Sequence, residues 1–340
     1  MGDLRVLVTG ATGFVGSHLA ERLCHEGAAV ACLVRPTSRL TALEGLPVET
    51  RVGTLEDADS LARAAADAQI VFHVAGITRA RTPEAYLRAN AEATARLVDA
   101  VARSCPGLRR FVYVSSLAAV GPAPTPEPLD ETADPRPLPG YGASKLAGEH
   151  AVLAARDRLP VTIVRPPAVY GPRDPNFIAL FRTARRLRLA PVIGGRDKML
   201  SMVHAADLAD GLWRAATTDA AVGQTYFIAS GTHTWGDIVA ALAAALGRRV
   251  RVLPIPSLVA RLIGEIGELR WTLTGKPQII CRRKIRDLLA PRWICTWAKA
   301  EHQLGYRPAM RLEEGFRQTA EWYAREGWLQ PAPTPFEGTR

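Results

Sequence analysis

A tyrosine and a lysine stand four positions apart in the segment YGASK, residues 141–145. We expect a helix to begin here and to run to about Arg156, so that Tyr141 and Lys145 share one helix face and can reach a common ligand. A cation close to a phenol favours the phenolate and lowers the pKa of the tyrosine. Tyr141 is therefore a candidate general acid or base, and Lys145 can also hydrogen-bond a cofactor ribose. As an isolated pair, the two would form only a surface contact.

Another hydroxyl group follows a predicted buried strand, Phe111–Ser115. In open α/β sheets, ligands bind beyond the carboxyl ends of the strands. Ser116, at that end, is therefore in a position where a hydroxyl can act on a ligand. His73 lies near the end of a further predicted strand, Ile70–Val74. We expect this histidine to be packed or hydrogen-bonded rather than catalytic.

Three glycines spaced three apart, Gly10, Gly13 and Gly16, separate a short apolar run at 5–9 from apolar residues at helical spacing. A strand, a glycine turn and a helix in this order point free backbone N–H groups and a helix N-terminus at a pyrophosphate. Gly10 can take the tight turn, Gly13 lets a ligand approach the backbone, and Gly16 lets helix and strand pack closely. The pattern predicts a dinucleotide site, in preference to a plain turn.

The strand after this helix, Ala28–Val34, bears on cofactor choice. In NAD-selective sites this strand commonly ends in a carboxylate that binds the adenosine ribose, whereas this chain has Val34 followed by Arg35. A guanidinium offers a bidentate, permanently charged partner for a 2′-phosphate. The sequence therefore favours NADP over NAD. The alternative is that Arg35 stacks on the adenine or points to water.

The length and composition of the chain restrict the class of protein to which it can belong. The chain has 340 residues, 48% hydrophobic and 22% charged, which suits one large or two interlocked globular domains. It has no apolar run of about 18 residues and no signal-peptide pattern at its start, so the cytoplasm is the expected compartment. The five cysteines are scattered without a CxxC pair and the seven histidines show no metal-ligand spacing. We therefore predict neither disulfides nor a metal site.

Other segments give clear helix and strand signals. A helix is expected from the N-cap Thr82, with Pro83 at its first position, to about Ser104, and Asn90 inside it suggests a buried hydrogen bond. The proline-rich loop 121–140 either borders a substrate cleft or is a surface excursion. Further predicted elements are the strand 48–52, the helix 57–66, the helix 207–216, the strand 225–229, the helix 235–246 with Thr234 as its N-cap, and the helix 312–326.

Positive charge is concentrated between Arg248 and Arg292, where eleven Lys/Arg oppose three acidic residues and leave a net charge of +8. Such a segment can meet nucleic acid, an anionic membrane or a phosphorylated substrate, although a solvated basic face is the favoured interpretation. Within it, the apolar helix Leu258–Thr274 could line a pocket or lie on a membrane. An amphipathic helix that packs on the protein is favoured. We expect no nucleic-acid partner.

Together these motifs carry a family resemblance. The sequence resembles an extended short-chain dehydrogenase/reductase of the NAD-dependent epimerase/dehydratase superfamily, and the match covers nearly the whole length. The matching segments are TGATGFVG at 9–16, VYVSS at 112–116, YGASK at 141–145, RPPAVYGP at 165–172, SMVHAADLA at 201–209 and HQLGYRP at 302–308.

The resemblance implies roles for these residues. Tyr141 would be the general acid or base, Lys145 its pKa-lowering and ribose-binding partner, and Ser116 the hydroxyl that polarises the substrate carbonyl, with Ser115 as a rival for that last role. The residues implied to contact the cofactor are Gly10, Thr12, Gly13, Phe14, Val15, Arg35, Leu55, Val74, Ala75, Tyr141, Lys145, Pro166 and Val169.

The resemblance also implies a fold and an assembly. It implies a Rossmann-type α/β fold, a doubly wound parallel sheet, with a smaller C-terminal mixed α/β substrate domain. The dinucleotide domain would comprise residues 1–170 and about 201–232, the substrate domain 171–200 and 233–330, and the tail 331–340. A homodimer built from the helices at Pro83 and Tyr141 is expected.

Two departures bear on the substrate. Ala168 and Leu200 replace an asparagine and an arginine that serve the diphosphate in the sugar-nucleotide branch. The chain is therefore more similar to the 3β-hydroxysteroid-dehydrogenase and dihydroflavonol-reductase type. Gly53-Thr54-Leu55 also departs from the family's Gly-Asp-Leu near the adenine.

Three hypotheses follow. The first is an NAD(P)-dependent oxidoreductase that interconverts an alcohol and a ketone on an apolar or mid-sized substrate. The second is a nucleotide-sugar epimerase or dehydratase with recycled NAD, in which Arg182, Arg185, Arg186 and Arg188 hold a diphosphate. The third is a catalytically silent binding protein. Peripheral membrane contact is possible but not favoured.

Overall fold

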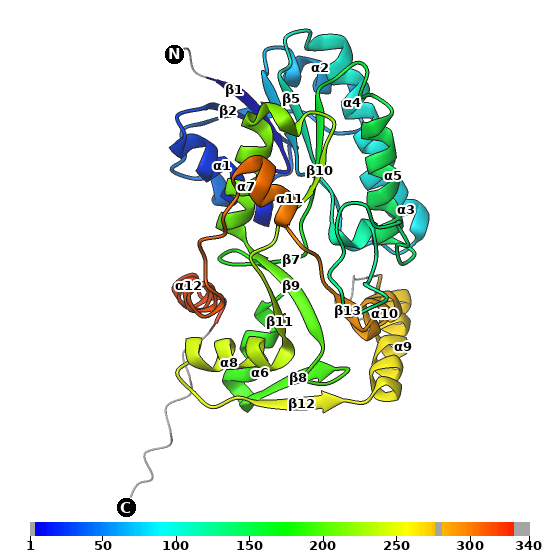
Figure 1. Cartoon of the computed structure of the whole chain (residues 1–340), viewed down its shortest axis with the longest axis vertical. Helices are drawn as coiled ribbons and strands as arrows, with labels where there is room; N and C mark the ends of the chain where they lie inside the picture. Colours follow the sequence, from blue (N-terminus) through cyan, green and yellow to red (C-terminus); the bar gives the residue numbers. More distant parts are fainter. Residues whose placement is uncertain (1–3, 276–280, 330–340) are drawn as a thin grey trace, which may run out of the picture.

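The structure, a computed structural model, describes residues 4–275 and 281–329. Within them, seven parallel strands form one sheet in the order β10-β6-β5-β4-β1-β2-β3 (Figure 1). The strands are β1 (Arg5–Thr9), β2 (Ala29–Val34), β3 (Val48–Val52), β4 (Ile70–His73), β5 (Arg110–Val114), β6 (Val161–Arg165) and β10 (Thr225–Phe227). The order reverses between β1 and β4, which is the point where such sheets bind ligands.

Helices cover both faces of this sheet, so its central strands are almost wholly apolar and buried. Residues of three helices pack on one face: α1 (Phe14–His25), α7 (Ala205–Thr217) and α11 (Ala298–Leu304). Residues of three others pack on the opposite face: α2 (Ala58–Ala65), α4 (Ala93–Ser104) and α5 (Tyr141–Leu153). The predicted Rossmann-type fold class is confirmed, with a smaller C-terminal α/β region beside it.

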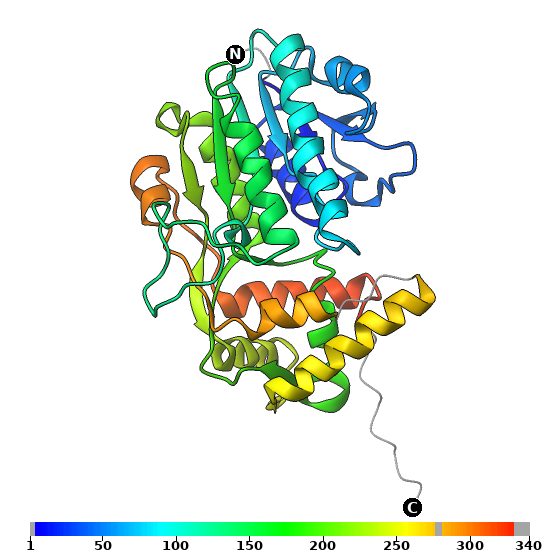
Figure 2. The ribbon, with the colours of Figure 1, turned by 90° about the vertical axis from the view of Figure 1, so that its right-hand side faces the viewer.

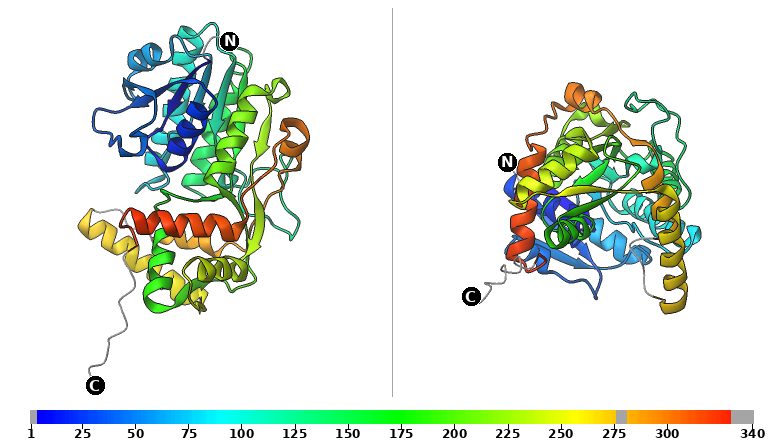
Figure 3. Two further views of the ribbon diagram at one scale, coloured as in Figure 1. Left: turned by 90° about the vertical axis from the view of Figure 1, so that its left-hand side faces the viewer. Right: turned by 90° about the horizontal axis from the view of Figure 1, so that it is seen from below.

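The smaller region lies below the main sheet in Figure 1. Strands β7 (Ala168–Tyr170), β9 (Met199–His204), β11 (Gly231–Thr234) and β13 (Arg292–Trp293) form its sheet, while β8 (Leu189–Ile193) pairs with β12 (Arg251–Ile255). Helices α6 (Ile178–Leu187), α8 (Trp235–Ala245) and α12 (Leu312–Arg325) belong to this region (Figure 3). Residues of these helices form an aromatic core. In that core Phe181 stacks on Phe316 at 5.6 Å between ring centroids. The predicted domain boundaries stay a prediction.

The helix expected from Pro83 to Ser104 is interrupted. Helix α3 (Pro83–Leu87) begins at the predicted N-cap, where the Thr82 hydroxyl accepts the backbone N–H of Ala85. A π-helical turn then spans Arg88–Glu92 before α4 begins. At this turn Asn90 is buried, its Oδ1 accepts the N–H of Ile77 and its Nδ2 donates to Ser144. The predicted buried hydrogen bond is therefore confirmed, and the wider turn aims this side chain between two neighbouring segments.

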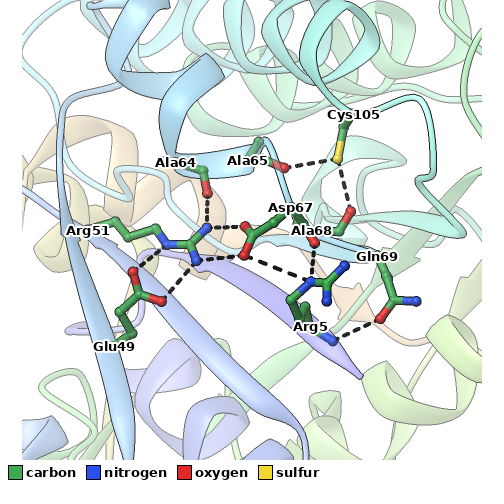
Figure 4. Close-up of polar contacts among 9 residues, drawn as sticks. All are labelled: Arg5, Glu49, Arg51, Ala64, Ala65, Asp67, Ala68, Gln69 and Cys105. Carbon is green, nitrogen blue, oxygen red and sulfur yellow. Dashed lines mark hydrogen bonds and ion pairs between the residues drawn. The ribbon is translucent and has the colours of Figure 1, made fainter. Parts of the chain in front are cut away.

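The edge strand β3 is held to the rest of the sheet by Arg51 (Figure 4). Its guanidinium bridges Glu49 on the same strand and Asp67 in the turn before β4, with an Nη1–Oδ1 distance of 2.5 Å to Asp67. This arginine holds the pKa of Asp67 below its usual value. Arg5 at the start of β1 donates to the carbonyl of Asp67, so the same turn also anchors the central strand.

Helix α9 (Ser257–Thr274) packs on the protein, as expected, but it does so with its small residues and not with its large aliphatic ones. Its buried residues are the small Ala260, Gly264 and Gly267 together with Trp271. Its larger aliphatic residues are exposed. The helix contacts α10 (Arg282–Leu289) and lies at the periphery in Figure 2. The reason for the difference is steric, because only small side chains let two helices approach closely at this contact.

Candidate active site

A cavity of about 1660 Å³ lies at the carboxyl ends of the main strands, between the main sheet and the smaller region. It is lined by every residue for which the sequence predicted a role in catalysis or cofactor binding. These are Gly10, Thr12, Gly13, Phe14, Val15, Arg35, Leu55, Val74, Ala75, Ser116, Tyr141, Lys145, Pro166 and Val169. The structure thus brings these residues to one site, and the role of each stays a prediction.

The glycine turn fits a dinucleotide pyrophosphate. Gly10 has a φ of +75°, and a Cβ there would lie 2.7 Å from Ala75. A Cβ on Gly16 would lie 2.1 Å from the carbonyl oxygen of Gly10, so the first turn of α1 packs on the turn after β1 more closely than any side chain permits. Gly13 caps α1 without a side chain, which leaves the first N–H groups of the helix directed at the cavity.

Ser116 and Tyr141 come from different elements that pack tightly. Ser116 caps the short helical turn Leu117–Ala119 after β5, where its hydroxyl accepts the N–H of Ala118. A Cβ on Gly142 would lie 2.4 Å from the carbonyl oxygen of Ala118, so the first turn of α5 lies directly against this segment. Burial raises the pKa of Tyr141 to about 12, and a hydrogen bond to Ser116 opposes this rise. The phenol of Tyr141 is therefore protonated at neutral pH.

Lys145 is buried and its ammonium is held on the protein side. Its Nζ donates to the carbonyl oxygen of Val114 at 2.7 Å and lies 4.4 Å from the centre of the Tyr113 ring. Burial lowers its pKa to about 7, against the opposing effect of Glu149. The expected lowering of the Tyr141 pKa by this cation is not seen in the structure, since burial dominates the pKa of both groups.

A buried ion pair supports this part of the site. Glu149, one helical turn after Lys145, receives two hydrogen bonds from the guanidinium of Arg165, at 2.9 and 2.6 Å. The Ser115 hydroxyl also donates to Glu149, at 2.5 Å. Ser115 also lines the cavity, but its hydroxyl is engaged by the carboxylate of Glu149, whereas the Ser116 hydroxyl is hydrogen-bonded to Tyr141. This geometry favours Ser116 over its rival as the group that meets a substrate.

Arg35 and Ser38 both line the cavity, at the end where the adenine of a cofactor is predicted to lie. The Ser38 hydroxyl accepts the backbone N–H of Arg35 at 3.1 Å, which fixes the loop that carries the exposed guanidinium. Sequence reasoning missed Arg88 and Arg96, which also line the cavity. Arg96 donates to the carbonyl of Leu55 and so holds the loop after β3. No motif marks these arginines. Arg88 lies in the π-helical turn, and Arg96 lies in α4.

The part of the cavity formed by the smaller region is mainly apolar, with Lys198, Lys284 and Asp287 as its charged side chains among the described residues. Its apolar lining includes Phe177, Leu180, Ile193, Leu200, Trp235 and Trp293. The Lys198 ammonium donates to the carbonyl of Leu288, and burial lowers its pKa to about 8. Sequence reasoning missed these residues, since they lie on elements far apart in the chain.

The structure decides two further expectations. From the loop 121–140, Leu138 and Pro139 line the cavity, while its earlier part pairs with the chain around β13. The loop therefore borders the cleft only at its end. The four arginines 182, 185, 186 and 188 do not line the cavity, and Arg182 instead donates to the carbonyl of Trp328.

His73 is structural, as expected. It is fully buried at the end of β4. Its Nδ1 and Nε2 atoms lie 2.7 and 2.9 Å from the hydroxyls of Thr9 and Thr94.

Across residues 4–275 and 281–329, no group of His, Cys, Asp or Glu could hold a metal ion. In the same part of the chain, no helix is long and apolar enough to cross a membrane.

Comparisons with known proteins agree with this geometry. The model of the "NAD dependent epimerase/dehydratase family" matches residues 6–229. A ceramide reductase of Caulobacter vibrioides is 34% identical, with 95% of this chain and 96% of that protein covered. A 4-hydroxy-2-methyl-3-oxo-4-farnesyl-3,4-dihydroquinoline-1-oxide ketoreductase of Stigmatella aurantiaca is 30% identical, over 92% and 94% of the two chains.

A decarboxylating sterol-4-alpha-carboxylate 3-dehydrogenase of Saccharomyces cerevisiae is 26% identical over 93% of this chain and 97% of that protein. Among solved structures, gox2253 superposes with a TM-score of 0.80 at 28% identity, covering 96% of this chain and 100% of that one. The resemblance inferred from the motifs is confirmed by these matches.

Proposed function

The chain belongs to the NAD-dependent epimerase/dehydratase family, in the extended short-chain dehydrogenase/reductase group of oxidoreductases, and on that premise we propose that it interconverts a ketone and an alcohol on an apolar substrate. The observation that carries this proposal is the composition of the cavity. The Ser116 and Tyr141 hydroxyls lie in the same cavity as the apolar and aromatic side chains of the smaller region. Apolar substrate surface buried there is removed from water, which favours binding.

The residues of this chain supply the proton and the orientation. A bound nicotinamide cofactor would supply the hydride. In the direction of reduction, Tyr141 donates its hydroxyl proton to the carbonyl oxygen of the substrate, while Ser116 hydrogen-bonds to that same oxygen. The high pKa of Tyr141 keeps it protonated before the reaction. Lys145 would hydrogen-bond the ribose of the cofactor and stabilise the tyrosinate that remains.

Arg35 and Ser38 favour NADP as the cofactor. A 2′-phosphate at this end would meet a permanent positive charge and a hydroxyl, and the preceding strand ends at Val34 rather than at a carboxylate. The relatives support the substrate class, because two have names that include a ceramide and a farnesyl-bearing quinoline. The four arginines 182, 185, 186 and 188, which could hold the diphosphate of a nucleotide sugar, lie outside the cavity lining.

A chain-length series tests the proposal. We expect the purified protein to oxidise NADPH in the presence of long-chain ketones. We also expect kcat/KM to rise with each added methylene, by up to roughly fourfold while the chain still fits the apolar lining. UDP-glucose with NAD serves as the comparison substrate. Turnover confined to nucleotide sugars, or a kcat/KM independent of chain length, would refute an apolar substrate.

A further inference from the structure

Helix α9 carries its large aliphatic side chains on its outer surface. Five of them recur at spacings of three and four residues and so form one stripe along the helix. They are Leu258, Leu262, Ile266, Leu269 and Leu273, with exposed fractions between 56% and 75%. A helix of 18 residues is about 27 Å long, so this apolar ridge spans the whole element. Water-exposed apolar patches of this kind mark interaction surfaces.

The packing of α9 fixes which face is outside. A Cβ on Gly264 would lie 2.9 Å from a side-chain carbon of Ile285, so the small-residue face is in close contact with α10. Trp271 is buried on this inner side. The aliphatic stripe cannot turn inward without separating the two helices. The exposed stripe is therefore a property of the folded chain and not of a loosely attached helix.

The charges around the stripe identify its partner. Both acidic residues of α9 are paired with α10: Glu265 with Arg282 at 2.8 Å and Glu268 with Arg283 at 3.7 Å. Within the described part of the chain, the exposed Arg261 and Arg270 of α9 take part in no ion pair. The stripe thus lies between free positive charges, in the segment with a net charge of +8.

We propose that α9 docks this protein on an anionic bilayer, with its aliphatic stripe in the interfacial region and Arg261 and Arg270 at the lipid phosphates. An apolar helix face bordered by basic residues is the usual design of an interfacial helix. Basic residues near an anionic surface each contribute about 1 kcal/mol of attraction. The proposal reverses the preference drawn from the sequence, which favoured a packing helix.

The position of α9 links this surface to the cavity. Helix α10, which packs on α9, contributes Lys284, Asp287 and Leu288 to the cavity lining. Docking through α9 would therefore place the apolar part of the cavity next to the bilayer, where an apolar substrate is concentrated. Only this last step rests on the proposed function, because membrane docking itself needs no reaction.

Co-sedimentation with vesicles tests the proposal. We expect the full chain to sediment with phosphatidylcholine vesicles that contain phosphatidylglycerol, and far less with phosphatidylcholine alone. The double variant Leu262→Glu/Leu269→Glu should lower the vesicle partition coefficient by roughly tenfold or more. The variant Arg261→Glu/Arg270→Glu should abolish the preference for anionic vesicles. The control Leu187→Glu/Val222→Glu changes two exposed aliphatic residues outside the cavity lining and should sediment like the wild type.

Two outcomes would overturn the proposal. One is equal, low sedimentation of the wild type with both kinds of vesicle. The other is a fall in solution mass in Leu262→Glu/Leu269→Glu, because the stripe would then be an interface between two copies of the chain. Cofactor binding, followed by fluorescence titration with NADPH, should be unchanged in all α9 variants. If the wild type did not bind NADPH, that result would instead count against the proposed function.

Discussion

At the scale of single residues, the site is organised around a protonated phenol. Tyr141 has a pKa raised to about 12 by burial, and its hydrogen bond to Ser116 opposes that rise. Lys145 has a pKa lowered to about 7 by the same burial. A charge on either group is costly here until a bound cofactor and substrate provide partners. The structure therefore brings a protonated phenol and a buried lysine to one cavity, where we propose that Tyr141 donates the proton and Lys145 stabilises the tyrosinate.

Removing the phenolic hydroxyl should abolish most of the turnover. We expect Tyr141→Phe to lower kcat by about two to four orders of magnitude, because it removes the proton donor while retaining the ring. The affinity for NADPH should change little, since the glycine turn is untouched. Tyr86→Phe is the matched control, because its ring lies 6.3 Å from that of Tyr141 but outside the cavity lining. Equal rates for Tyr141→Phe and the wild type would exclude this role.

Arg35 should determine cofactor choice. In Arg35→Glu, a carboxylate would face the 2′-phosphate, so we expect the Kd for NADPH to rise at least tenfold more than the Kd for NADH. Arg39→Glu, which changes an exposed arginine outside the cavity lining, controls for net charge. Titration of both cofactors by fluorescence measures the effect. A parallel weakening of the two would show that Arg35 does not contact the phosphate.

His73 should make stability depend on pH. Burial lowers its pKa from 6.5 to about 3, so below pH 6.5 the unfolded chain binds a proton that the folded chain excludes. Stability then falls as the pH falls from about 6.5 towards 3, by up to about 1.4 kcal/mol per pH unit for this group.

Urea unfolding between pH 7.5 and 5 measures this slope. In His73→Gln the free energy of unfolding should depend less steeply on pH than in the wild type, whatever its absolute value. The exposed His25→Gln should keep the wild-type slope. Identical slopes in all three proteins would show that His73 does not exclude a proton.

At the scale of elements, the close approach of α1 to the turn after β1 shapes the end of the cavity where we propose that the cofactor binds. In Gly16→Ala the new Cβ would lie 2.1 Å from the carbonyl oxygen of Gly10, and a backbone atom cannot move aside as a side chain can. We expect a loss of roughly 1–3 kcal/mol in the free energy of unfolding and at least a tenfold weaker affinity for NADPH. Gly107→Ala, where nothing lies within 4 Å, is the control. Unaltered binding in Gly16→Ala would contradict this account of the turn.

Elements with local signals could be predicted from the sequence, and those set by tertiary contacts could not. The strand β1, the glycine turn and the cap at Thr82 are dictated by neighbouring residues, so the pattern identified them. The π-helical turn at Asn90 depends on Ile77 and Ser144, which belong to other segments. The outward stripe of α9 depends likewise on how closely Gly264 meets α10. A hydrophobic pattern shows that a face is apolar but not what covers it.

The residues of the site also divide into those that a local motif identifies and those that only tertiary contacts bring together. Ser116, Tyr141 and Lys145 stand in short motifs, and each motif places its residue at a strand end or a helix start. The apolar lining comes from α6, β8, β9, α8 and β13, whose residues carry no motif. Their convergence follows from the fold of the whole chain. For that reason the chemistry could be predicted from the sequence in more detail than the substrate pocket.

At the scale of the whole molecule, we expect a homodimer through the outer faces of α4 and α5. These faces include the small, half-buried residues Ala95 and Ala147, at which two helix pairs can approach closely. Light scattering should give twice the mass of one chain. Ala147→Arg should shift the protein to the monomer, and Ala62→Arg on α2 should leave it dimeric. A monomeric wild type at micromolar concentration would exclude this assembly.

Net hydride transfer to an apolar ketone is the central claim, and isotope labelling tests it most directly. The protein would be incubated with a long-chain ketone and NADPH that carries deuterium at the transferred position of C4, and the product would be analysed by mass spectrometry. We predict an alcohol with one deuterium on its carbinol carbon, formed in proportion to the NADP released. A contradictory result would be unlabelled ketone with no NADP formed, together with tightly bound NAD and the interconversion of a nucleotide sugar.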